Sequence, residues 1–309
     1  MFSMDATFKQ YQDYRVTVDD DVGYTQKRET MAFPTAALAA FTVYAYAIYW
    51  YTLPGAGHLP AGTVNVPTWI GNLSLELPVV FTIAYLAMCY FGPKVMASRK
   101  AFDPKGFMFV YNAYQTIFNI ATVVLFVTEL TRWKVSAWGG TMTWSDPHSF
   151  GICLGIWLHY NNKYLELLDT VFMVLRKKNA QLSFLHVYHH CLMLWAWWLV
   201  CFTLQNNDCI DAYFGACMNA GIHVIMYSYY LMTALKIVCP WKKYITQVQI
   251  LQFAVVFAHA CFVLYDAQCP KILPYSQMFV MMNMLVLFGR FYSKQYGGQK
   301  TSTASKKKR

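Results

Sequence analysis

Three histidines lie within a stretch of five residues in an otherwise apolar part of the chain. His186 lies three residues before His189 and four before His190, so on a helix all three imidazoles project from one face. A neutral imidazole can act as a nucleophile, and burial favours the neutral form. The flanking sequence, residues 191–202, is apolar enough for a membrane, where ionisable side chains usually face the interior of a helical bundle. The spacing therefore predicts a buried functional site.

A second group of ionisable side chains lies in the apolar run that precedes the histidines. Lys163, Glu166 and Asp169 follow one another at intervals of three residues, so they lie on one side of a helix and can pair along it. A charge at the centre of a bilayer costs about 2.5 to 3.5 kcal/mol even on the lenient insertion scale, which favours a functional role. For Lys163 and Glu166 the alternative is an ion pair that locks the helix against its neighbours. For Asp169 we expect a contact that orients a histidine.

A fourth imidazole belongs to a later apolar stretch. His223, Tyr227 and Tyr230 have the i, i+4, i+7 spacing of one helical stripe, and Asn219 lies one turn before them. Tyrosine near a membrane boundary often serves only as an interfacial anchor, and this alternative stays open for Tyr229 and Tyr230. His223 lies in the middle of the stretch, so it is a candidate member of the same site as the other three histidines.

The elements that must position these side chains are membrane-spanning helices. Of the 309 residues, 57% are hydrophobic and only 13% are charged, which is too apolar for an ordinary soluble domain. Eight runs are about long enough to cross a bilayer: residues 31–53, 74–92, 106–127, 150–175, 182–203, 211–235, 245–266 and 274–293. A cleaved signal peptide is the alternative for the first run, but that run is long and ends in bulky aromatic residues. The sequence therefore predicts an all-α polytopic membrane protein.

The basic residues indicate which side of the membrane each loop faces. Of the 25 Lys and Arg residues, 21 fall on one side when eight spans are assumed, and such residues accumulate on the cytoplasmic side. We therefore place both termini in the cytoplasm, with residues 1–30 as a polar tail. The charge of +10 is divided among short clusters, which does not favour binding of nucleic acid. Cys209 and Cys269 both fall on the opposite, oxidising side, where a disulfide between them is an open alternative.

Four motifs follow one another along the chain: KxxExxDT at 163–170, QxxxLHxxHH at 181–190, HxxMYxYY at 223–230 and TxxQxxQ at 246–252. In this order they resemble the ELO family of very-long-chain fatty acid elongases. The resemblance begins near Leu75 and implies a seven-helix bundle that encloses an acyl tunnel, formed by residues 74–295. Residues 31–53 would then be an extra N-terminal transmembrane helix. Residues 296–309 form a basic cytosolic tail that resembles a dilysine retrieval signal, so the expected location is the endoplasmic reticulum membrane.

The resemblance implies that an acyl-CoA condenses with malonyl-CoA, with loss of carbon dioxide, to a 3-ketoacyl-CoA two carbons longer. It casts His189 as the nucleophile that forms an acyl-imidazole, with His223 opposite it. The other implied catalytic residues position the malonyl group and stabilise its enolate (His186 and Asn219) or orient these groups (His190 and Asp169). Substrate-binding residues are expected in the polar motifs and in the basic loops, where CoA phosphates need cations: Lys163, Glu166, Gln181, Tyr227, Tyr230, Arg176, Lys177, Lys178, Lys242 and Lys243.

The same resemblance implies no metal and no cofactor, because acyl-CoA and malonyl-CoA are substrates. The implied partners are membrane lipid and the ketoacyl reductase, dehydratase and enoyl reductase of the elongation cycle, and a homodimer is left open. The segments 176–190, 213–215 and 241–247 resemble elongases of polyunsaturated chains. For Tyr188, between the histidines, the alternative is that it only packs beside the site. Two alternatives remain. A membrane di-iron desaturase or hydroxylase also uses HxxHH but needs further histidine motifs, and a transporter or receptor leaves the four spacings unexplained.

Overall fold

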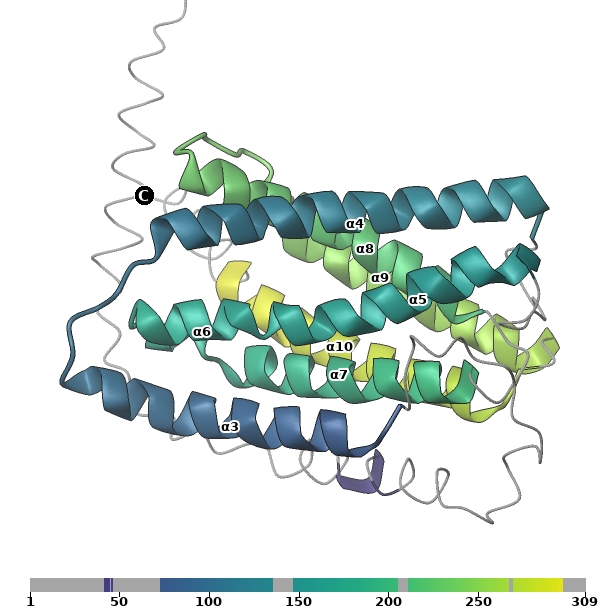
Figure 1. The fold of residues 1–309 in the computed structure, drawn as a ribbon, viewed down its shortest axis with the longest axis horizontal. Helices are drawn as coiled ribbons and strands as arrows, with labels where there is room; N and C mark the ends of the chain where they lie inside the picture. The colour runs from purple at the N-terminus through teal and green to yellow at the C-terminus, as the bar shows by residue number, and fades with distance from the viewer. Residues whose placement is uncertain are drawn as a thin grey trace, which may run out of the picture. The chain divides into compact units, whose positions relative to one another are not determined.

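The described part of the protein is built from helices. The computed structural model describes residues 42–44, 46, 73–135, 147–204, 211–266 and 269–296. The chain divides into two compact units, Met1–Thr42 and Val43–Arg309, and the helices named below belong to the second (Figure 1). In chain order they are α3 (Glu76–Ala97), α4 (Lys105–Trp133), α5 (Pro147–Glu166), α6 (Leu168–Leu175), the short 3₁₀ helix η2 (Asn179–Gln181), α7 (Phe184–Leu204), α8 (Ala212–Ala234), α9 (Lys242–Asp266) and α10 (Ile272–Tyr296).

The predicted class, an all-α polytopic membrane protein, is confirmed. No residue in the described ranges lies in a β-strand. Helices α3, α4, α7, α9 and α10 are each long and apolar enough to cross a membrane. Large hydrophobic side chains on α3 and α4, such as Phe91 and Val110, are exposed, as expected of helices that face lipid.

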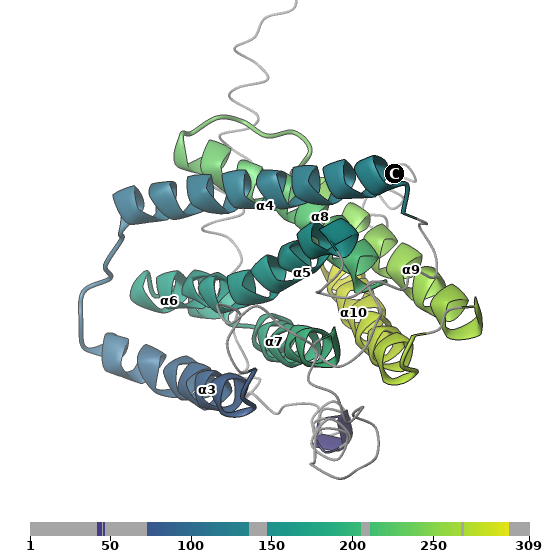
Figure 2. The same ribbon diagram turned by 45° about the vertical axis from the view of Figure 1, so that its right-hand side comes forward.

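Helix α5 lies inside the helical layers and carries its polar side chains there. It packs against α4, α7 and α8, and Figure 2 shows it between α4 and α7. The side chains of Lys163 and Glu166 on α5 are only 3% and 2% exposed, so they face protein. Charged and amide side chains are tolerated at membrane depth only in such an interior, which explains why α5 and α8 can be less apolar than the five spans.

Helix α7, which carries the histidine motif, is the most buried of the five apolar spans. In its most apolar window 72% of the residues are buried, compared with 22% for α3 and for α4. It packs against α3, α5 and α10. The histidines are therefore presented to the interior of the bundle.

The predicted span 150–175 is divided in two, so the expectation of one continuous helix was wrong there. Leu167 separates α5 from α6. The amide of Leu167 bonds the carbonyl of Tyr164 (3.3 Å), and the amide of Thr170 bonds the carbonyl of Leu167 (3.1 Å). This turn is therefore tightened to the i→i+3 pattern, which often marks a functional position when it occurs within a helix. The irregular turn lies between Glu166 and Asp169, the two carboxylates of the KxxExxDT motif.

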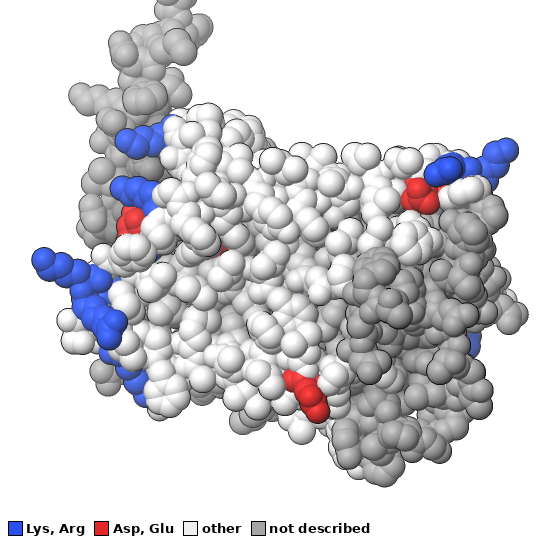
Figure 3. Space-filling view, viewed as in Figure 1, with Lys and Arg blue, Asp and Glu red and all other residues white. Residues whose placement is uncertain are grey.

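Basic side chains gather at one end of the helices. That end holds the C-termini of α3, α6, α8 and α10 and the N-termini of α4, α7 and α9, and Figure 3 shows Lys and Arg atoms along its margin. At the other end, Arg132 lies in the last turn of α4, and Lys134 and Lys271 lie in loops. The basic residues of the described ranges are thus divided between the two ends as the sequence predicted. The side of the membrane that each end faces stays a prediction.

Several predicted features fall outside the described residues: the tail 1–30, most of the span 31–53, the basic tail from residue 297, and Cys209. Within that first span, residues 42–44 and 46 are helical. The hydroxyl of Tyr44 lies 2.7 Å from that of Ser276 on α10, and its ring stacks on Phe279. Cys269 is disulfide-bonded.

Candidate active site

The three histidines of the motif lie next to one another on the first turns of α7. The rings of His186 and His190 are 4.5 Å apart between centroids, and those of His189 and His190 are 5.3 Å apart. His190 is buried, whereas His186 and His189 are half-buried. The i, i+3, i+4 spacing thus produces the cluster of imidazoles that the sequence predicted.

Helices α3 and α6 hold this cluster from one side. Nε2 of His186 is 2.8 Å from the hydroxyl of Thr170 on α6, and that hydroxyl is 3.0 Å from the hydroxyl of Tyr85 on α3. The ring of Tyr85 also faces His190 at 5.9 Å. Thr170 is the last residue of the KxxExxDT motif, so a hydroxyl beside Asp169, and not Asp169 itself, makes the contact with a histidine.

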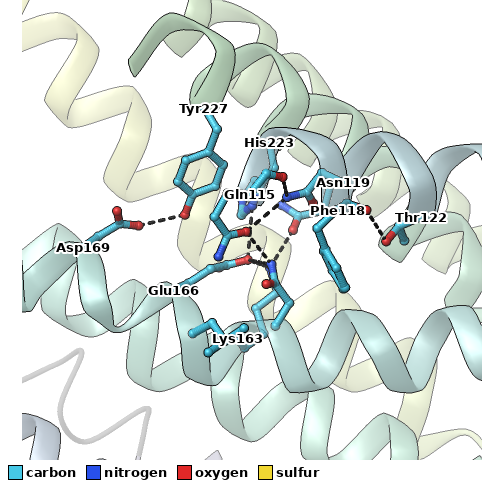
Figure 4. Close-up of polar contacts among 12 residues, drawn as sticks. Gln115, Phe118, Asn119, Thr122, Lys163, Glu166, Asp169, His223 and Tyr227 are labelled. Carbon is cyan, nitrogen blue, oxygen red and sulfur yellow. Dashed lines mark hydrogen bonds and ion pairs between the residues drawn. The ribbon is translucent and has the colours of Figure 1, made fainter. Parts of the chain in front are cut away.

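A buried cluster of charged and polar groups lies between α5 and α8 (Figure 4). Nζ of Lys163 donates to Oε1 of Glu166 (2.7 Å) and to Oδ1 of Asn219 (3.0 Å). Nδ1 of His223 lies 3.2 Å from the same Oε1 of Glu166, a close contact that is not well aligned for a hydrogen bond. The predicted pairing of Lys163 with Glu166 is therefore present, and it is directed at the fourth histidine.

Amide side chains that sequence reasoning missed extend this cluster. Nδ2 of Asn162 donates to Oε1 of Glu166 (3.0 Å) and to Oε1 of Gln115 on α4 (2.9 Å). Asn119, one turn further along α4, also donates to Oε1 of Gln115 (3.3 Å). Gln115 and Asn119 are fully buried. The only signal in the sequence was that polar residues recur one turn apart in α4, which by itself cannot name their partners.

The second carboxylate of the motif has a different partner from the expected one. Asp169 accepts a hydrogen bond at Oδ2 from the hydroxyl of Tyr227 (2.7 Å), so the expectation that it contacts a histidine was wrong among the described contacts. The hydroxyl of Tyr111 on α4 lies 3.4 Å from that of Tyr227 and donates to the carbonyl of Leu165 (3.3 Å). Tyr227 is fully buried, while Tyr230 is 38% exposed.

The histidine motif lies near enough to the polar cluster for the two to interact electrostatically. His189 lies within electrostatic reach of Lys163, Glu166 and His223, although these residues come from α7, α5 and α8. The protein therefore offers a half-buried imidazole that is electrostatically coupled to a second imidazole, whose Nδ1 lies 3.2 Å from a carboxylate oxygen. Such a pair can supply a nucleophile and a proton carrier where little water is present. Within the described ranges, no group of three or more His, Cys, Asp or Glu side chains is arranged to hold a metal ion.

The basic loop after α6 is partly engaged within the protein. Nε of Arg176 pairs with Oδ1 of Asp103 at 3.0 Å, and Nζ of Lys177 donates to the carbonyl of Ala97 (3.2 Å). These contacts hold the α3–α4 loop and the last residue of α3 against the end of α6. Lys178 is exposed, as are Gln181 of η2 and Lys242 at the start of α9, while the side chain of Lys243 lies outside the described part.

Comparison with known proteins covers most of the chain. A model of the ELO family, described as GNS1/SUR4, matches residues 72–307. The chain is 37% identical over 238 residues to very long chain fatty acid elongase 5 of Tachysurus fulvidraco, which covers 74% of this chain and 77% of the relative. It is 36% identical over 239 residues to the protein of that name from Xenopus tropicalis (74% and 77%), and 36% identical over 222 residues to the one from Homo sapiens (70% and 73%).

Proposed function

Because the chain belongs to the ELO family, we propose that its buried histidines catalyse the condensation step of fatty acid elongation. The protein is a multi-pass membrane enzyme of very-long-chain fatty acid elongation. The proposed reaction joins a long-chain acyl-CoA to malonyl-CoA and gives 3-ketoacyl-CoA, CoA and carbon dioxide. Its charge balance consumes one proton, because malonyl-CoA brings a carboxylate that leaves as neutral carbon dioxide.

The observation that carries the proposal is the position of His189. It is half-buried, it is within electrostatic reach of His223, and no hydrogen bond to its ring nitrogens occurs among the described residues. His186, by contrast, is tied to Thr170, and His190 is buried. We infer that a nitrogen of His189 attacks the thioester carbonyl, the acyl group is transferred to that nitrogen, and the CoA thiolate leaves.

His223 is the group that we propose supplies the proton to the thiolate. The Glu166 carboxylate, 3.2 Å from Nδ1, stabilises the imidazolium form of His223, which keeps its proton on Nδ1 and donates the one on Nε2 to sulfur. His223 then takes up a new proton from solution. This uptake provides the one proton that the whole reaction consumes.

Asn219 is placed to assist the second half of the reaction. Its Oδ1 accepts a hydrogen bond from Lys163 (3.0 Å), and the side chain is only half-buried. The N–H groups of the amide are therefore turned away from Lys163 and can meet the enolate oxygen that forms when malonyl-CoA loses carbon dioxide. The enolate carbon attacks the acyl carbon, and neutral His189 is released. We retain a malonyl-positioning role for His186.

The CoA groups are proposed to bind at the basic end of the helices. The exposed Lys178 and Lys242 are cations of the kind that phosphates need. If this end faces the cytosol, as the basic residues predict, both substrates reach the site from there. The endoplasmic reticulum location and the work with the reductases and dehydratase of the elongation cycle are parts of the same proposal.

The substrate range is proposed from the spacers of the histidine motif, which resemble elongases of polyunsaturated chains. The test supplies membranes that contain the protein with labelled malonyl-CoA and matched saturated and polyunsaturated acyl-CoAs. We expect labelled 3-ketoacyl products, with a graded preference for polyunsaturated chains, because apolar fit discriminates only about 10- to 200-fold. A higher kcat/KM for saturated chains throughout would reject the preference, and the absence of any product that depends on the protein would reject the condensation.

A further inference from the structure

One oxygen of Glu166 receives three nitrogen groups. Oε1 lies 2.7 Å from Nζ of Lys163, 3.0 Å from Nδ2 of Asn162 and 3.2 Å from Nδ1 of His223. The side chain is 2% exposed, so protein groups, and not water, surround this carboxylate. Lys163 balances the charge of the carboxylate, and Asn162 adds a second fixed direction.

The amide of Asn162 is held in turn by α4. Its Nδ2 also donates to Oε1 of Gln115 (2.9 Å). Gln115 donates from Nε2 to the hydroxyl of Tyr111 (3.4 Å), and its Oε1 accepts a further bond from Asn119 (3.3 Å). Figure 4 shows Gln115 and Asn119 pointing from α4 toward Glu166 and His223. The orientation of the Gln115 amide is thus fixed from both sides.

The unpaired oxygens of two of these amides show that the amides are oriented for their N–H contacts. Oδ1 of Asn162 and Oδ1 of Asn119 are buried without a hydrogen-bond partner in the described part of the chain. A buried acceptor without a partner reduces stability, and such groups in a native structure require an explanation. If the Asn162 amide turned over, its oxygen would face the oxygens of Glu166 and Gln115, and both donor contacts would be lost. The arrangement therefore keeps N–H groups on Glu166 even though two oxygens stay unpaired.

We propose that Asn162 and Gln115 are positioning residues that hold the Glu166 carboxylate against Nδ1 of His223 while the acyl group is transferred to His189. Neither residue touches substrate. Without them the carboxylate has only Lys163 to fix it and spends less time facing His223, so Nε2 of His223 is less often ready to protonate the thiolate. This inference rests on the proposed function, and it concerns the rate of the first half of the reaction.

The test measures CoA release by the purified full-length protein given acyl-CoA without malonyl-CoA. In Asn162→Leu and Gln115→Met, side chains of similar size remove the amide contacts. We expect the single-turnover rate of CoA release to fall by about tenfold for Asn162→Leu, the size of an effect from one hydrogen bond to a charged group, and by less for Gln115→Met. The amount of CoA released and the KM for acyl-CoA stay as in the unaltered protein, as does the rate at which preformed acyl-enzyme reacts with malonyl-CoA.

Two polar neighbours, one next to Asn162 and one next to Gln115, provide controls. Among the described residues, Asn161 donates only to the carbonyl of Trp157 in its own helix (2.8 Å), and Thr116 donates to the carbonyl of Asn112 (2.8 Å). Asn161→Leu and Thr116→Val are therefore expected to release CoA at the normal rate. Because Asn162 and Gln115 act in one chain of contacts, the double variant should be no slower than Asn162→Leu alone.

The outcomes separate this inference from the proposed function. Normal rates in both Asn162→Leu and Gln115→Met would overturn the positioning role. A fall in initial rate that is explained entirely by a smaller amount of CoA released would also overturn it, because a misfolded fraction of the protein alone gives that result. If the unaltered protein released no CoA without malonyl-CoA, the proposed acyl-histidine would itself be wrong.

Discussion

The hydroxyl of Tyr227 donates a 2.7 Å hydrogen bond to Oδ2 of Asp169, and so ties α8 to α6 one helical turn from His223. His223 and Tyr227 on α8 therefore face Glu166 and Asp169 on α5 and α6 as two successive pairs. The irregular turn at Leu167 lies between the two carboxylates. The packing of α8 on these helices thus fixes the position of His223.

Tyr227→Phe removes this bond but keeps the ring, whose centroid is 5.6 Å from that of His223. We expect the free energy of unfolding to fall by about 1.5 to 3 kcal/mol, because a hydrogen bond to a carboxylate is lost in a buried place. Thermal unfolding in detergent measures this. Tyr230→Phe is the control, since its more exposed ring should lose little stability. Equal effects of the two substitutions would show that the bond to Asp169 is unimportant.

Single and double substitutions of Lys163 and Glu166 can show whether this ion pair has a structural or a functional role. Lys163→Met or Glu166→Leu alone should reduce stability by about 3 to 5 kcal/mol, because each leaves an uncompensated buried charge. The double variant should recover much of that stability, since two apolar side chains of similar volume can replace a buried ion pair. We expect it to remain inactive, because the carboxylate beside His223 is gone. An active double variant would show that the pair only locks α5 in place.

The sequence predicted what depends on local spacing and hydropathy. The single-face arrangement of His186, His189 and His190, the Lys163–Glu166 pair and the apolar spans all follow from helical periodicity and length. Helix ends were less well predicted where they leave the apolar region. Helix α4 continues to Trp133, six residues past the predicted end of the span, because charged residues end a hydrophobic run without ending a helix.

Contacts between distant helices could not be predicted. Gln115 and Asn162 are separated by 47 residues in the chain, and their bond depends on how α4 packs against α5. Asp169 was expected to orient a histidine because carboxylates often accept a hydrogen bond from a functional imidazole. The tertiary packing instead places Tyr227, 58 residues away, at that carboxylate.

The ion pair between Arg176 and Asp103 leads to a prediction about the basic loop. Reversing one charge, as in Arg176→Asp, should raise the KM for acyl-CoA by about two- to fivefold, the range expected for a partly exposed pair that holds a loop. The double variant Arg176→Asp with Asp103→Arg should restore it. If Arg176 contacts CoA phosphate directly, the double variant would keep the high KM, and the loop contact would not be its main role.

The topology prediction follows from the position of 21 of the 25 basic residues on one side of eight spans. In sealed microsomes, tags at the N-terminus and at the C-terminus should both be digested by added protease. A protected N-terminal tag with a digested C-terminal tag would show that residues 31–53 do not cross the membrane. The contact of Tyr44 with α10 fits either result.

The most direct measurement is the mass of the protein after it has been mixed with acyl-CoA alone. If His189 is the nucleophile, the unaltered protein gains the mass of one acyl group, and the modified peptide is the one that contains His189. His189→Ala gains no such mass and forms no 3-ketoacyl product, while its thermal unfolding still shows a folded bundle. An acyl group found on another residue, or a His189→Ala protein that still elongates, would contradict the proposed mechanism.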